Sequence, residues 1–114
     1  MKQYTDEQKR QINEIDIFTE IGEPAAYEQL AEEATELAKA ALKCARVIRK
    51  ENYTPKTIEE CKDELKEEFS DVICCADILK LQYSEEIVSY KMFRWKQRIF
   101  EYQKKRVKGD GKVF

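Results

Sequence analysis

The chain has 114 residues, 42% hydrophobic and 39% charged, a size that suits one domain and a hydrophobic content that argues against disorder. The formal net charge of -2 supplies no overall basic field to recruit a nucleic acid polymer. Turn-forming residues are few, with 3 Gly and 2 Pro, which favours long helices joined by short connections.

The first helix is expected to begin at Thr5 and to end near Gly22. Thr5 and Gln8 match a capping box, in which the Thr hydroxyl and the Gln side chain satisfy free amide groups. Pro24 suits the first turn of a second helix, because the N–H that proline lacks has no partner there. This second helix is expected to reach about Lys50.

The sequence Asn-Tyr-Thr-Pro at residues 52–55 predicts the next break. A second capping box at residues 57–60 opens a third helix, which is expected to reach about Leu81. Ser84 is the expected N-cap of a fourth helix that ends near Arg106.

Four helices with short connections predict an all-α fold, a four-helix antiparallel bundle. The chain has no low-complexity segment and no inter-domain linker, so we expect one domain over residues 1–114, with a loose tail at residues 107–114 that contains Gly109 and Gly111. Residues 1–10 lack the apolar run of a signal peptide, and no stretch approaches the length of a membrane span. These features predict a soluble, cytoplasmic protein that does not bind membranes.

The four cysteines all fall among apolar positions of the predicted helices: Cys44, Cys61, Cys74 and Cys75. None forms a C-x-x-C pair, and the chain has no His to complete a zinc site, so we expect buried free thiols in a reducing compartment. The absence of His also excludes His-based nucleophile triads and argues strongly against a di-iron bundle built on Glu-x-x-His motifs.

The second and third predicted helices repeat one acidic pattern, which appears as LAEEATEL and as LKEEFSDV. Positions i and i+3 share a face of a helix. Glu33 and Glu36 therefore lie together beside the apolar stripe of their helix, and Glu68 and Asp71 lie in the matching place on the other. If the two helices pack antiparallel by these stripes, the four carboxylates converge at the edge of the core.

Such a convergence has an electrostatic cost that a cation removes. Two carboxylates about 4 Å apart repel by roughly 4 kcal/mol at an effective dielectric constant of about 20, so the cluster needs cations or must bind protons. Hard oxygen ligands suit Mg²⁺, and also Mn²⁺. A single E-E-x-x-E is most often a solvated helix face, but two matched copies beside apolar stripes favour a metal site.

The motif E-E-x-x-E at residues 32–36, followed by E-x-x-D at residues 68–71, resembles the MazG-like family of all-α nucleoside triphosphate pyrophosphohydrolases. These enzymes are relatives of the dimeric dUTPases and the dCTP pyrophosphatases, and the resemblance covers roughly residues 5–106. It implies Mg²⁺-dependent hydrolysis of a nucleoside triphosphate to a monophosphate and pyrophosphate, by attack at the α-phosphorus. The catalytic and metal-binding residues that it implies are Glu33, Glu36, Glu68 and Asp71.

The resemblance also implies a homodimer or a homotetramer. Dedicated roles in removing dUTP, dCTP or abnormal nucleotides (house-cleaning) are all compatible with it. Similar proteins carry Lys and Arg on the fourth helix, often with an Asn between them, and Arg94 stands near that place here. Lys91, Arg94 and Arg98 are accordingly expected to contact substrate phosphates, for which the Arg fork is well shaped. The other interpretation of this basic row is a solvated face.

Gln29 lies one turn before Glu33 on the same face, and we expect it to hydrogen-bond the substrate or a ligand carboxylate. Two other classes of function remain open. One is a non-catalytic helical interaction module whose acidic residues are solvated surface. The other is a carboxylate-metal hydrolase that acts on a different phosphorylated metabolite.

Overall fold

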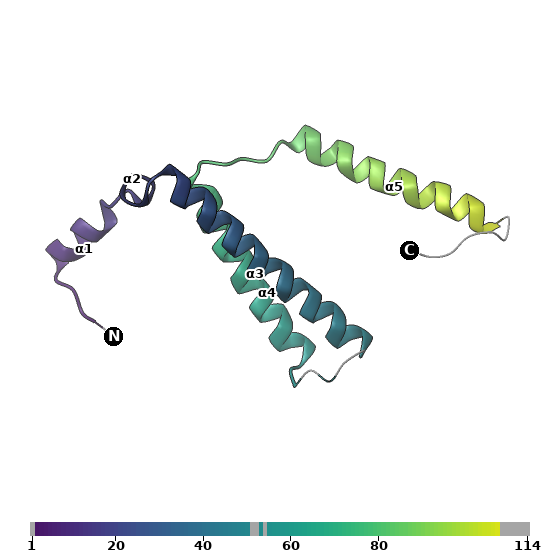
Figure 1. Ribbon diagram of the computed structural model, residues 1–114, viewed down its shortest axis with the longest axis horizontal. Helices are drawn as coiled ribbons and strands as arrows, with labels where there is room; N and C mark the ends of the chain where they lie inside the picture. The colour runs from purple at the N-terminus through teal and green to yellow at the C-terminus, as the bar shows by residue number, and fades with distance from the viewer. Residues whose placement is uncertain (1, 51–52, 54, 108–114) are drawn as a thin grey trace. The chain divides into compact units, whose positions relative to one another are not determined.

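The computed structural model describes residues 2–50, 53 and 55–107, and their regular structure is entirely helical, which confirms the all-α prediction (Figure 1). The chain divides into two compact units, Met1–Leu81 and Gln82–Phe114. The first unit contains α1 (Asp6–Asn13), α2 (Ile17–Ile21), α3 (Glu23–Arg49) and α4 (Ile58–Ile78), and the second contains α5 (Glu85–Val107). Within the described ranges, no helix is long and apolar enough to cross a membrane.

The prediction of a single helix from Thr5 to Gly22 is wrong, because two helices occupy this segment. α1 begins with the predicted capping box, in which the amide of Gln8 donates to the Thr5 hydroxyl at 3.1 Å. The interruption comes at Asp16, whose backbone is extended (φ -96°, ψ 105°) and whose carboxylate accepts a hydrogen bond from Thr19. Short polar side chains favour such helix-starting positions because they bond locally to the next turn.

α3 starts and stops close to where the sequence predicts. Gly22 precedes it with φ 88°, a conformation that side chains rarely adopt, and Pro24 lies in the first turn. At the other end Lys50 adopts the left-handed conformation (φ 57°), and its amide donates to the carbonyl of Arg46 at 2.9 Å. This bond satisfies one of the carbonyls that a helix end leaves without a partner.

α4 begins with the second predicted capping box, which the structure confirms. The amide of Glu60 donates to the Thr57 hydroxyl at 3.1 Å, and the amide of Thr57 donates to the Glu60 carboxylate at 3.0 Å. This second hydrogen bond lowers the pKa of the Glu60 carboxyl, because it stabilises the charged form.

The Glu60 cap is expected to make the stability of the fold depend on pH. A lowered carboxyl pKa stabilises the fold above the pKa of the unfolded chain, and this contribution disappears as the pH falls through the folded-state value. Gln can also cap in this position, so Glu60→Gln keeps the cap but removes its charge. The wild type is therefore expected to have a higher melting temperature than Glu60→Gln at neutral pH, and the two melting temperatures are expected to converge in acid, where Glu60 is uncharged. Thermal unfolding followed by circular dichroism checks this, with Glu59→Gln as the exposed neighbouring control. A difference that does not change with pH would contradict it.

α4 ends at Ile78, whereas the sequence predicts an end near Leu81. Lys80 turns into the left-handed conformation (φ 56°) and its amide donates to the carbonyl of Asp77. The amide of Leu81 donates back to the carbonyl of Ala76 at 2.8 Å. These two hydrogen bonds form a Schellman motif, which closes the helix one turn earlier than the apolar pattern suggests.

α3 and α4 lie side by side as an antiparallel hairpin (Figure 1). Small side chains fill the seam, and the buried apolar residues of the described chain are Ala26, Ala40, Cys44, Cys61 and Cys75. All four thiols are free, as expected, but Cys74 is exposed. Neighbouring residues on a helix point about 100° apart, so Cys74 and Cys75 cannot both face the seam.

Large apolar side chains remain exposed on both units. On the hairpin they include Leu42, Ile48 and Phe69, which keep 59%, 64% and 54% of their surface accessible. On α5, Phe93 and Trp95 are exposed as well. An amphipathic helix normally buries such a face against another element. The expected tail at residues 107–114 lies outside the described residues, apart from Val107, which ends α5.

Candidate metal centre

Three of the four predicted carboxylates meet at the seam of the hairpin. Glu33 on α3 and Glu68 and Asp71 on α4 each offer a carboxylate oxygen, and the three oxygens lie within 4.8 Å of one another. Ligands on opposite sides of an octahedral Mg²⁺ stand roughly 4 Å apart, given Mg–O distances of about 2.1 Å. The separation of the three oxygens is therefore close to that of ligands around one ion.

The electrostatics of this carboxylate group disfavour its fully charged form. Partial burial raises the pKa of Glu68, and the charges of Asp71, Glu33 and Glu36 raise it further. Burial, followed by the charge of Glu33, also raises the pKa of the neighbouring Cys75 thiol. A bound proton or cation would relieve this concentration of negative charge.

Glu36, the fourth predicted ligand, is not among the three residues whose carboxylate oxygens lie together. Its carboxylate lies 3.6 Å from the ammonium of Lys39, one turn further along α3, and both side chains are exposed. Its charge nevertheless contributes to the raised pKa of Glu68, so it lies near the group. The two acidic motifs match in sequence, but in the structure α4 contributes both of its acids to the group and α3 contributes one.

Gln29 contacts the carboxylate group by a hydrogen bond to Glu33. Its side-chain amide donates a hydrogen bond at 3.0 Å to the carboxylate of Glu33, one of the three residues of the group. A donor in this position restricts the rotation of the carboxylate. Partners of this kind orient metal ligands and are often important for affinity.

A hollow of about 480 Å³ opens beside the carboxylates, between α3 and α4. Its lining includes Glu36, Lys39, Lys43, Arg46, Glu64 and Glu68. The sequence reasoning missed the three cations of α3. Their spacing was the available signal, because positions three, seven and ten residues after Glu36 fall on the same helix face.

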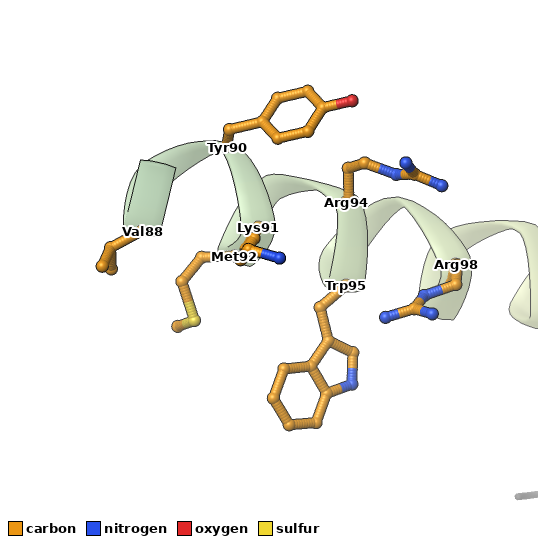
Figure 2. A pocket seen from close by; sticks show the side chains of 7 residues that line it. All are labelled: Val88, Tyr90, Lys91, Met92, Arg94, Trp95 and Arg98. Atoms are coloured by element: carbon orange, nitrogen blue, oxygen red, sulfur yellow. The ribbon is translucent and has the colours of Figure 1, made fainter. Parts of the chain in front are cut away.

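The basic residues predicted for substrate binding lie on α5, in the second unit. Lys91, Arg94 and Arg98 line a surface hollow of this helix together with Trp95 (Figure 2). Arg94 extends on the same side as Tyr90, away from Trp95, and its guanidinium lies 5.9 Å from the centre of the Tyr90 ring. This distance is compatible with a cation–π contact.

No family model, no curated protein and no solved structure matches the chain. The donor set of the carboxylate group indicates which ions fit it. Glu33, Glu68 and Asp71 offer only carboxylate oxygens. Hard divalent cations such as Mg²⁺ and Mn²⁺ prefer these donors, whereas Zn²⁺ sites usually include His or Cys.

Proposed function

We propose that the chain is a Mg²⁺-dependent nucleoside triphosphate pyrophosphohydrolase of the MazG-like type. The observation that carries this proposal is the group formed by Glu33, Glu68 and Asp71, which two matched acidic motifs supply from facing helices. The oxygen-only donor set and the raised pKa of Glu68 both support a divalent cation at this place.

In this function the carboxylates would hold the ion, and Gln29, which donates a hydrogen bond to the Glu33 carboxylate, would restrict the orientation of that ligand. Glu36 would join the set if its ion pair with Lys39 opened, which would cost little because both side chains are exposed. A bound Mg²⁺ would neutralise phosphate charge and lower the pKa of the attacking water.

The reaction begins with the water oxygen forming a bond to the α-phosphorus. The bond from that phosphorus to the oxygen bridging to the β-phosphorus breaks, and pyrophosphate leaves with the electron pair while the water proton passes to solvent. Lys91, Arg94 and Arg98 on α5 are proposed to contact the phosphates. Arg guanidinium groups suit this role because they bind phosphate oxygens in pairs.

The proposal includes a homodimer or homotetramer in which the helices form the four-helix bundle. The exposed apolar side chains of the hairpin and of α5 support it, because a soluble protein seldom leaves such faces uncovered. We expect sedimentation velocity to give a single species with the mass of two or four chains. A monodisperse monomer would contradict this expectation.

Incubation with a panel of canonical and modified nucleoside triphosphates, with and without Mg²⁺, tests the activity directly. Chromatography of the products is expected to show monophosphate and pyrophosphate only when Mg²⁺ is present. The order of the substrates then separates dUTP or dCTP removal from a broader house-cleaning role. A folded sample that turns over none of the nucleotides would contradict the proposal.

A further inference from the structure

A row of cations runs along α3, away from the carboxylate group. This cation row consists of Lys39, Lys43 and Arg46, which share one helix face with Glu36. With a rise of 1.5 Å per residue, Lys39 stands about 5 Å and Arg46 about 15 Å beyond Glu36 along the helix axis. The row and Glu36 line the same hollow as Glu68, so the hollow runs from the carboxylate group along α3.

Lys43 is held in place by the opposite helix. Its ammonium lies 3.5 Å from the carboxylate of Glu64 on α4, and both side chains are about two-thirds covered. Glu64 also forms an ion pair with Lys56, which precedes α4. Because one carboxylate is shared between two ammonium groups, Lys43 keeps positive charge that an anionic ligand can use.

The charges of the hollow make anion binding conditional on a metal ion. The cation row and four carboxylates line the hollow, one carboxylate from Glu36 on α3 and three from Glu64, Glu67 and Glu68 on α4, so the lining by itself is slightly negative. Glu33 and Asp71, which complete the carboxylate group, add further negative charge beside the hollow, and one divalent cation held by the group would cancel two of the negative charges there. An anion would then meet less repulsion and could bind where the ion and the cation row are adjacent, whereas it would be repelled without the ion.

We propose that Lys39, Lys43 and Arg46 form a subsite for a diphosphate group, which for a triphosphate substrate is the pyrophosphate that leaves. The inference rests on the proposed function, which supplies the metal ion that accompanies the diphosphate. It adds a phosphate-binding surface on α3, separate from the basic residues of α5. The leaving pyrophosphate lies along the hollow, while the α-phosphorus faces the carboxylate group.

Calorimetric titration of inorganic pyrophosphate into the full chain tests the subsite without any turnover. We expect binding in the presence of Mg²⁺ and at least tenfold weaker binding without it. Lys43→Gln and Arg46→Gln are each expected to weaken the Mg²⁺-dependent binding about tenfold, since each removes one charge-assisted contact. Arg46→Gln leaves the Lys43–Glu64 ion pair intact, so it tests the row even where Lys43→Gln unfolds the hairpin.

Lys66→Gln is the matched control. Lys66 lies on α4 and lines a different, apolar hollow with Leu65 and Phe69, so its replacement should leave pyrophosphate binding unchanged. Selective weakening in the two cation-row variants supports the subsite even if no nucleotide is hydrolysed. Triphosphate turnover together with wild-type pyrophosphate affinity in Arg46→Gln rejects the subsite and leaves the proposed function standing. Pyrophosphate binding of equal strength with and without Mg²⁺ also rejects it.

Discussion

Glu33→Gln and Asp71→Asn are each expected to lower kcat/KM for a nucleoside triphosphate by at least about 100-fold at a fixed Mg²⁺ concentration. Replacing a residue that only supports a metal ligand typically costs about 10- to 100-fold, so removing a ligand itself is expected to cost more. The amide side chains keep nearly the same shape and remove one negative charge. Because the two residues come from different helices, similar losses in both variants would indicate one shared site.

Glu32→Gln is the control for this pair of variants. Glu32 belongs to the same acidic motif but is exposed, and it lies about 100° around α3 from Glu33. Its replacement is expected to change kcat/KM by less than about twofold, as for a surface residue outside the site. Full activity in Glu33→Gln, with helicity retained by circular dichroism, would show that the metal-site assignment is wrong.

Mg²⁺ is expected to raise the melting temperature of the wild type, and Glu68→Gln is expected to lose this response. At a free concentration of about 100 times its Kd, an ion that binds only the folded state adds about 2.7 kcal/mol to the free energy of unfolding. For a domain of this size, such a change corresponds to a rise on the order of 10 °C. Thermal unfolding across a Mg²⁺ series measures the effect.

The same variant is expected to be more stable than the wild type when Mg²⁺ is absent. Partial burial, Asp71 and Glu33 raise the pKa of Glu68, which means that its charged form destabilises the fold at neutral pH. The sign follows from linkage, since a raised carboxyl pKa gives stability below the ordinary value and removes it as the pH rises. Gln carries no charge at any pH, so Glu68→Gln avoids the repulsion.

Asp63→Asn serves as the control, because Asp63 is an exposed acid of α4 outside the carboxylate group. It should keep the wild-type response to Mg²⁺. Equal Mg²⁺ shifts in the wild type and in Glu68→Gln would place the ion elsewhere. No shift in the wild type would favour a non-catalytic interaction module with solvated acidic faces.

Helix starts were the most predictable part of the fold. The capping boxes at Thr5 and Thr57 form as expected, and Pro24 lies in the first turn of α3. Each of these features depends on residues within one helical turn, so the local sequence is sufficient to predict it. The interruption at Asp16 and the Schellman motif at Lys80 were missed, because apolar periodicity continues past both positions.

The sequence predicted which acidic residues belong to the candidate site, but not which of their carboxylates lie together. Helical periodicity selected Glu33, Glu68 and Asp71, and the structure brings these three together. It also predicted Glu36 as an equal member, whereas this carboxylate pairs with Lys39 at 3.6 Å. The offset between the facing helices determines which acids meet, and that offset depends on how the side chains in the seam pack.

The sequence by itself therefore determined the all-α class, the ends of α3 and the two acidic faces, because hydrogen bonds and side-chain directions within one helix depend on near neighbours. Only the tertiary structure decided the register of α3 against α4. Small buried residues such as Cys44 and Cys61, together with the Lys43–Glu64 ion pair, accompany that register. These contacts join residues distant in the chain, and their geometry exists only once the hairpin has packed.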